Sequence, residues 1–432
     1  MAERSRALSG PAGADARSAR LVRADLARVD GRWQRDVLFA VGADRIHPAS
    51  VVDLARAEAA GIDPAAAPRL RAAVLPPITD AHVHVGLTEL ADRPSGSLAR
   101  VLDLGWDPAQ IVARAAAADA ASGFTRTEVR FAGAFLTAPG GYPSTRGWAP
   151  PGSVVGVAAP VEADAVVATQ VALGADVIKV TLNADAGPVH DDATLEAIVA
   201  AARRRRRPVI AHVEGVGQAE RAGRAGVSAL AHAPFTERLD DALLAWMAGA
   251  GLRWIATLDI HERGRGAGTD ALDTALDNTR RFVAAGGTVV YGTDAGNDLG
   301  HGELEPRELK LLGSAGLSAV ALLDALDSRG LLPTWGATVS LLPSDAATHA
   351  ALGADAALSV GTAPSARTTP PARATLRADD EHRPTIDPRS HAAPRDAGTE
   401  PGRLATPDLA ELIPTLLGAR PVHAAHLEEH LS

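Results

Sequence analysis

The chain has 432 residues, of which 46% are hydrophobic and 22% are charged, a composition typical of a folded globular protein of enzyme size. Its net charge of −9 argues against a nucleic-acid-binding protein, and no apolar run is long enough to cross a membrane. The absence of cysteine excludes disulfides, thiolate nucleophiles and cysteine-bound zinc, so any metal must be held by His, Asp, Glu or a modified Lys.

The N-terminal flank, residues 1–73, is expected to lie outside the main domain. It starts with a loose polar segment that contains no apolar core of a signal peptide, so the expected location is the cytoplasm. Short β-like runs at 20–22 and 36–41 favour a small sheet. The Ala-rich stretch 50–73 favours a helix that prolines interrupt.

From residue 74 onward, apolar runs alternate with Ala-rich amphipathic stretches, which indicates βαβ units and a parallel sheet. Strands are predicted at residues 74–85, 125–131, 154–158, 176–182, 208–213, 229–233, 254–258 and 288–292. Helices are predicted at residues 108–122, 163–174, 193–206, 217–226, 239–251, 270–285 and 305–315.

This alternation predicts a (β/α)8 TIM-like barrel over residues 74–330, since eight strand–helix units need about 250 residues. An open doubly wound sheet is the alternative, but no G-x-G-x-x-G motif follows the first strand. The second and third strands are the least regular, and the segment 123–151 is more typical of an active-site loop. Beyond residue 330 the alternation fades. Residues 364–432 are expected to be a largely disordered tail with short helices at 407–417 and 422–431.

Six residues that suit a metal site fall at the predicted strand ends, which all meet on one face of a barrel. They are His82 and His84 on the first strand, Lys179 on the fourth, His212 on the fifth, His232 on the sixth and Asp294 after the eighth. Each has an ordinary interpretation when taken alone, as a core histidine, a lysine with a buried stem or a capping aspartate. Their joint placement favours a metal centre.

With these residues in place, the sequence resembles the amidohydrolase superfamily of metal-dependent hydrolases over about residues 74–330. The matching segments are residues 77–84, 174–180, 208–212, 226–232 and 291–294. The segment Gly-Ala-Asp-Val-Ile-Lys-Val at 174–180 is similar to the prolidase-like branch, in which CO2 carboxylates the lysine. A plain ammonium group cannot bind a cation, so Lys179 can be a ligand only in this modified form.

The resemblance implies a site for two divalent metal ions. The implied ligands are His82, His84 and Asp294 for one ion, His212 and His232 for the other, and a carbamate on Lys179 between them. Zinc is the expected metal for a His-rich site without cysteine, with Mn, Co and Fe as alternatives. A hydroxide bridging the metals would attack the substrate, and Asp294 would serve as general base and then as general acid.

The expected function is therefore hydrolysis of an amide or peptide-like C–N bond in a small molecule, with dipeptides or N-acyl amino acids as the substrate class. Deaminases of the superfamily place a Glu three residues after the fifth-strand His and lack the lysine. Here Glu214 lies two residues after His212 and Lys179 is present, so hydrolysis is favoured. The alternatives are a lactone, cyclic-amide or phosphoester hydrolase and a metal-binding protein without catalysis. The expected partner is a small-molecule substrate, neither nucleic acid nor a membrane, and a homo-oligomer is left open.

Several residues near the predicted catalytic face are weaker candidates for binding a substrate carboxylate or an oxyanion, and solvated loops would explain them equally well. These substrate-binding candidates are Arg130, Tyr142, Arg146 and His261. His190 and His301 are further candidates for supporting positions, or ordinary loop residues.

The superfamily usually pairs both flanks of the chain into a small β-sandwich beside the barrel, so the resemblance implies such a domain here. The candidate N-terminal segment is 20–48. The candidate C-terminal segment is about 340–363, within a possible return to the small domain at 331–363. The family's return strand follows a Gly, two variable residues and an Ala-Asp pair. Ala354 and Asp355 supply the pair, but Ala350 stands at the Gly position.

Overall fold

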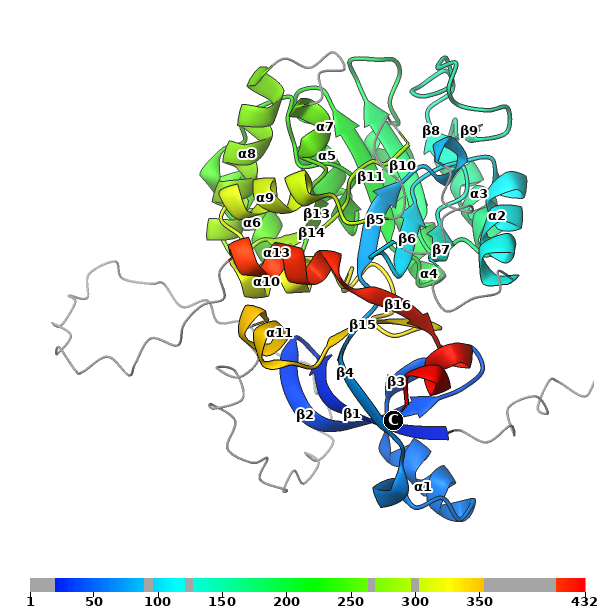
Figure 1. The fold of residues 1–432 in the computed structure, drawn as a ribbon. Helices are drawn as coiled ribbons and strands as arrows, with labels where there is room; N and C mark the ends of the chain where they lie inside the picture. Colours follow the sequence, from blue (N-terminus) through cyan, green and yellow to red (C-terminus); the bar gives the residue numbers. More distant parts are fainter. Residues whose placement is uncertain are drawn as a thin grey trace, which may run out of the picture.

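The protein consists of a barrel of parallel strands surrounded by helices and a smaller sheet packed beside it (Figure 1). This is a computed structural model, which describes residues 20–88, 96–120, 127–262, 269–296, 303–352 and 409–431. Within these residues, no helix is both long and apolar enough to cross a bilayer. The predicted α/β class is confirmed.

Eight strand positions form the barrel, and all of their pairings are parallel. In order they are β5 (Thr79–Val83), β6 (Arg100–Asp103), β7 (Glu128–Phe131) with its continuation β8 (Phe135–Thr137), β10 (Ile178–Asn183), β11 (Val209–Glu214), β12 (Ala229–Leu230), β13 (Arg253–Ile255) and β14 (Thr288–Val290). β7 pairs with β6 and β8 pairs with β10, so this bent strand joins the two parts of the ring. The segment after β14 closes the ring on β5, where the Asp294 N–H donates to the carbonyl of His82 at 2.8 Å.

Two of the eight predicted strands need correction. The run predicted at 74–85 is divided: its start ends β4 (Arg69–Leu75) of the small sheet, and Pro76 and Pro77, which lack N–H donors, separate it from β5. The run at 154–158 forms β9 (Val154–Gly156), which pairs only with β8 at the edge of the sheet. The sequence analysis missed β6, which is the second strand of the ring, so the run predicted as the second strand at 125–131 supplies the third as β7.

The predicted helices are confirmed, with ends that differ by at most two residues. They are α2 (Pro108–Ala120), α3 (Ala163–Ala172), α4 (Asp192–Arg204), α5 (Gln218–Arg224), α6 (Asp241–Gly249), α8 (Thr269–Ala284) and α9 (Pro306–Ser314). Two short helices, α7 (Asp259–Glu262) and α10 (Ala319–Ala325), accompany them. Side-chain caps begin several of these helices; Asp191, for example, accepts from the Thr194 N–H at 2.7 Å at the start of α4. Helices surround the barrel strands in Figure 1.

The smaller sheet is built from both ends of the chain, as the resemblance implied. Its strand order is β16-β15-β4-β1-β2-β3. The other strands are β1 (Arg20–Val29), β2 (Arg32–Val41), β3 (Ile46–Pro48), β15 (Thr338–Pro343) and β16 (Arg420–His423). The accompanying helices are α1 (Val51–Ala59), α11 (Ala346–Ala351), α13 (Leu409–Leu417) and the 3-10 helix η5 (Ala424–His430).

The C-terminal part of the small sheet differs from the prediction. The return strand is β15, at the start of the segment expected at 340–363. Residues 353–363 of that segment lie outside the described residues, as does 364–405. The helix predicted at 422–431 is instead strand β16 followed by a 3-10 helix. β16 pairs antiparallel with β15, so the end of the chain completes one edge of the sheet.

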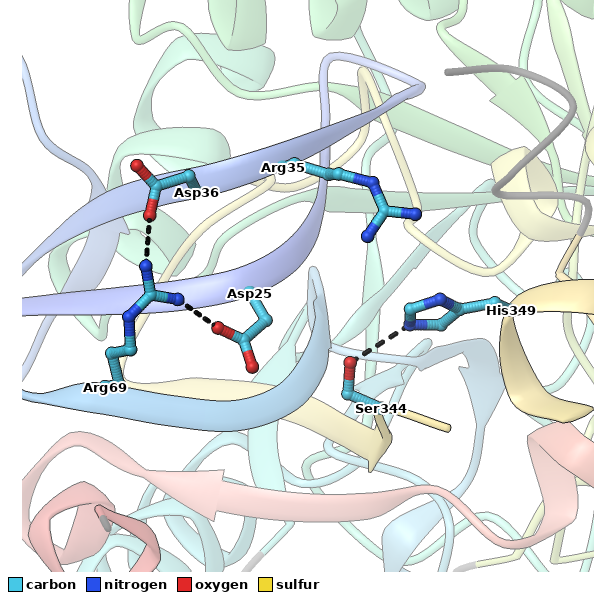
Figure 2. Close-up of a pocket in the computed structure, with 6 residues that line it drawn as sticks. All are labelled: Asp25, Arg35, Asp36, Arg69, Ser344 and His349. Atoms are coloured by element: carbon cyan, nitrogen blue, oxygen red, sulfur yellow. Dashed lines mark hydrogen bonds and ion pairs between the residues drawn. The ribbon is translucent and has the colours of Figure 1, made fainter. Parts of the chain in front are cut away.

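A polar pocket lies on the small sheet (Figure 2). Arg69 of β4 bridges Asp25 of β1 and Asp36 of β2, at 2.5 and 3.0 Å. On the other side, His349 Nε2 lies 3.0 Å from the Ser344 hydroxyl. The two ion pairs of Arg69 connect strands β1, β2 and β4 of the small sheet.

Candidate metal centre

Three of the predicted ligands converge at the carboxyl ends of β5 and β14. The Nε2 atoms of His82 and His84 each lie 3.1 Å from a carboxylate oxygen of Asp294. The candidate ligand atoms of these three residues all lie within 4.8 Å of one another, and all three residues are buried. Two imidazoles and a carboxylate at this spacing form a donor set that suits a divalent transition metal.

The remaining histidines extend this cluster along the strand ends. The ring of His232 lies 4.7 Å from that of His82 and 5.0 Å from that of His212, measured between centroids. The four imidazoles therefore form one continuous group. The structure brings the predicted residues together, and their binding of a metal stays a prediction.

Lys179 lies further from the carboxyl end of its strand than predicted, and so deeper in the barrel. It is the second residue of β10 and pairs with Ile210, whereas His212 pairs with Thr181 further along. Its side chain is 2% exposed, and its charge acts on the pKa of all four imidazoles, after the larger effect of burial. Burial lowers the pKa of Lys179 to about 7, against the opposing charges of Asp294 and Asp103. An unprotonated amine, the form that reacts with CO2, is therefore accessible near neutral pH.

Backbone carbonyls orient two of the imidazoles. His82 Nδ1 lies 2.6 Å from the Ala231 carbonyl, and His84 Nδ1 lies 3.2 Å from the Gly105 carbonyl. A carbonyl can only accept, so Nδ1 carries a proton in both rings and Nε2 is the nitrogen that faces Asp294. This arrangement is the one that a metal ligand needs at the atom facing Asp294.

Side chains orient the other two imidazoles. His232 Nδ1 lies 2.7 Å from the Thr257 hydroxyl, and His212 Nε2 lies 3.3 Å from a carboxylate oxygen of Glu214. The side-chain amide of Asn183 donates a hydrogen bond to that same Glu214 oxygen at 2.5 Å. Each of the four histidines thus has one ring nitrogen held by a supporting protein atom, and in His82 and His84 the other nitrogen faces Asp294.

The protonation states also fit metal binding. Burial lowers the pKa of His82 to about 4 and that of His232 well below its ordinary value, so both imidazoles are neutral at pH 7. Burial would raise the pKa of Asp294, but the neighbouring His82 and His84 outweigh it and hold that pKa well below its usual range. Burial would lower the pKa of His84, but its contact with Asp294 outweighs burial and raises that pKa. A cation bound at His84 would therefore displace a proton that this ring holds more firmly than usual.

Aromatic side chains line one side of the cluster. The ring of Tyr142 stacks on His212 at 5.1 Å, and Trp148 lies 5.9 Å from His84. The exposed Arg146 places its guanidinium 5.5 Å from the centre of the Tyr142 ring. Two of the predicted substrate-binding residues therefore lie beside the cluster.

His261 of α7 also lies near the site. Its ring is 4.4 Å from Phe235, which itself lies 6.3 Å from His232. The side chain is buried, and its Nε2 atom has no hydrogen-bond partner among the described residues. Burial lowers the pKa of His261 to about 4, so this histidine is a neutral hydrogen-bonding group.

The structure does not bring Arg130 to the cluster. Its guanidinium pairs with Glu128, the first residue of β7, and approaches Asp176, which precedes β10, at 3.5 Å. Both partners lie toward the amino ends of their strands, away from the metal centre, so the predicted substrate-binding role is not supported. His190 is buried in the β10–α4 connection, where it interacts with the backbone of Leu136 and Val157. His301 lies outside the described residues.

The sequence analysis missed the residues that support the cluster. Thr257 and Asn183 are short polar residues at or just after strand ends, a position that only the barrel geometry makes notable. Asp80 and Asp103 are buried and accept hydrogen bonds from backbone N–H groups beside the histidines. A polar residue at a strand end is the one signal that could have found them.

No model of a protein family and no characterised protein sequence matches the chain. Several solved structures, in contrast, are similar to this chain. An ochratoxinase from A. niger matches with a TM-score of 0.57 and 20% identity, over 76% of this chain and 90% of that one. A Xaa-Pro dipeptidase with methionine bound in its active site matches with a TM-score of 0.54 and 17% identity, over 76% and 94%.

A putative prolidase from Bifidobacterium longum matches similarly, with a TM-score of 0.54 and 20% identity, over 76% of this chain and 89% of that one. Each similarity covers about three quarters of this chain. The chain therefore shares the fold of these structures, a TIM-like barrel with a small β domain, which confirms the predicted fold.

Proposed function

We propose that this prolidase-like amidohydrolase fold carries a metal-dependent hydrolase that cleaves an amide or peptide-like C–N bond of a small molecule. The observation that carries the proposal is the convergence of His82, His84 and Asp294 within 4.8 Å at the strand ends. The rings of His212 and His232 extend that group.

Two divalent cations fit the donor set, and zinc is the metal that we propose for an imidazole-rich site without cysteine. His82, His84 and Asp294 would hold one ion and His212 and His232 the other, with carboxylated Lys179 between them. Bound there, such ions lower the pKa of a water molecule and polarise a scissile carbonyl. The cytoplasm is the location that we propose.

Asp294 is the group that moves the proton. Its carboxylate is ionised because His82 and His84 hold its pKa down, so it can accept a proton from the attacking water. A C–O bond forms as the carbonyl carbon is attacked, and the C–N bond then breaks. Asp294 returns the proton to the leaving nitrogen, which departs as a neutral amine.

A dipeptide or N-acyl amino acid is the substrate class that we propose. Arg146 is an exposed cation beside the cluster and suits a substrate carboxylate. Tyr142 and Trp148 offer aromatic surface next to His212 and His84. The neighbouring structures that are named as a dipeptidase and a prolidase support this class without deciding it.

The test combines metal analysis with a substrate panel of dipeptides, N-acyl amino acids, lactones, cyclic amides and phosphoesters. We expect the purified chain to contain divalent metal and to hydrolyse a C–N substrate. Asp294→Asn should retain metal and lower kcat by about 10²- to 10⁴-fold, since the general base is lost. Asp273→Asn, an exposed aspartate on α8, is the control and should leave kcat unchanged.

Other outcomes reassign the function. Activity confined to lactones, cyclic amides or phosphoesters would identify one of those hydrolases. Bound metal without turnover of any substrate would identify a metal-binding protein without catalysis. A chain that contains no metal and is unaffected by Lys179→Ala would contradict the proposal.

A further inference from the structure

The seventh barrel strand supplies none of the six predicted ligands, yet it ends beside the metal centre. Thr257 lies two residues after the end of β13 and is 0% exposed. Its hydroxyl oxygen lies 2.7 Å from Nδ1 of His232, which comes from the neighbouring strand β12. We propose that Thr257 is a positioning residue that fixes the orientation and tautomer of His232 for metal binding.

The hydrogen bond defines which nitrogen of His232 can bind a metal. A neutral imidazole has one N–H and one lone pair. Because Nδ1 is engaged by the hydroxyl of Thr257, Nε2 is the nitrogen left for a cation. When Nε2 gives its lone pair to a cation, the hydrogen of the neutral ring lies on Nδ1 and the hydroxyl accepts it. This is the pairing that metal-bound histidines usually make with a second residue.

The backbone of Thr257 supports a functional reason for its identity. Its φ is +52°, a left-handed conformation that a β-branched residue rarely adopts and that glycine adopts freely. The conformation is held by the Thr257 N–H, which donates to the Gly292 carbonyl at 3.1 Å. Threonine fits this backbone conformation poorly, yet at this position its hydroxyl reaches His232. Strained residues of this kind are typical of functional sites.

This contact can be tested without changing any proposed ligand. The equivalent partners of His82 and His84 are backbone carbonyls, which a substitution cannot remove. Thr257→Val keeps the shape of the side chain and deletes the hydroxyl, whereas Thr257→Ser keeps the hydroxyl. Thr257→Gly deletes the hydroxyl and also suits the left-handed backbone, so it separates the loss of the hydrogen bond from backbone strain.

The experiment is a titration of the metal-free full-length chain with Zn²⁺ in competition with a chromophoric chelator, and it rests on the proposed two-metal site. We expect two equivalents bound by the wild-type chain. Thr257→Val and Thr257→Gly should weaken one of the two equivalents by about 10- to 100-fold, and Thr257→Ser should restore wild-type affinity. Thr338→Val in β15 is the matched control, because its buried hydroxyl has no partner among the described residues.

Wild-type affinity for both equivalents in Thr257→Val and Thr257→Gly would overturn the inference and leave the proposed function standing. If Thr257→Val fails to fold, Thr257→Gly decides the same question, since its backbone is relieved rather than strained. Equal weakening in Thr257→Ser would also overturn the inference, because packing alone would then matter. A wild-type chain that binds no Zn²⁺ overturns the proposed function and this inference with it.

Discussion

At the scale of single residues, Asp80 ties the two barrel strands that carry three of the proposed ligands. Its carboxylate accepts from the His82 N–H at 3.0 Å and from the Thr293 N–H at 3.1 Å. The Thr293 hydroxyl also donates to it, at 2.5 Å. Asp80 therefore joins β5, which bears the histidines, to the segment that leads into Asp294.

Replacing Asp80 with Asn is expected to lower the free energy of unfolding by about 1–3 kcal/mol, because an amide nitrogen cannot accept and leaves a buried donor unpaired. Urea unfolding monitored by circular dichroism measures this change. The exposed Asp270→Asn on α8 is the control and should stay within about 0.5 kcal/mol of wild type. Equal stability of Asp80→Asn and the control would show that these bonds contribute nothing.

At the scale of elements, a close approach between strands requires glycine at position 292. A Cβ atom there would lie 2.4 Å from Ile255 Cγ2 of β13 and 3.1 Å from His82 Cβ of β5. The segment after β14 therefore passes between its neighbours with no room for a side chain. Gly249 at the end of α6 differs, since a Cβ there would meet no atom within 4 Å.

These two glycines predict opposite effects on stability. Gly292→Ala should lower the free energy of unfolding by about 1–3 kcal/mol, because the added methyl group forces β13 and β5 apart. Gly249→Ala should raise it by about 0.5–1 kcal/mol, because alanine is the better helix former and nothing obstructs it. Thermal unfolding of both variants checks the pair, and equal changes of the same sign would contradict this account of the barrel.

Helices and strands could be predicted from the sequence where they depend on the pattern of side chains within the same segment. The helices were predicted because their apolar residues recur with the helical period, and α4 and α6 also begin at capping aspartates. Strand β6 was missed because Arg100 and Asp103 make it read as polar. Both are buried, and Arg100 is neutralised by Glu128 at 2.8 Å, a partner on another strand that no local pattern reveals.

At the scale of the whole molecule, the first two strands of the small sheet contact residues far along the chain, in the barrel helix α10 and at the end of α11. Arg28 of β1 donates to Asp324 of α10 at 2.7 Å. The indole N–H of Trp33 in β2 donates to the Leu352 carbonyl at 3.2 Å. The flanks of the chain thus pack against the barrel as parts of one molecule.

A buried carboxyl group on the outer helices should make global stability depend on pH. Glu308 of α9 is 0% exposed and accepts from the Asp259 N–H at 2.8 Å. Burial raises the pKa of Glu308 from 4.5 to about 8. Between these values the folded chain keeps a proton that the unfolded chain releases, so stability falls as pH rises across this range.

We expect Glu308→Gln to remove this dependence. Relative to Glu308→Gln, the wild-type free energy of unfolding should fall by up to about 1.4 kcal/mol per pH unit between the two pKa values. Urea unfolding at a series of pH values measures both slopes. The exposed Glu303→Gln should behave as wild type, and parallel slopes for wild type and Glu308→Gln would contradict a proton held at Glu308.

The sequence by itself determined the class of fold and the candidate ligands. Strand–helix alternation follows from side-chain periodicity within each segment, and this predicted the barrel and most of its elements. The motif His82-Val83-His84 and the polar residues ending later strands predicted which side chains meet, because strand ends of a parallel barrel share one face. These inferences needed only local pattern and one rule of topology.

Only the tertiary structure decided how the ring closes and how its histidines are held. It placed β6 in the ring and β9 at the edge, and it brought β16 from the end of the chain into the small sheet. It also paired His232 with Thr257 and turned Arg130 toward Glu128. Each of these outcomes depends on hydrogen bonds or ion pairs between residues on separate strands or at opposite ends of the chain. Such contacts leave no local pattern, because they form only once the folded backbone brings the partners together.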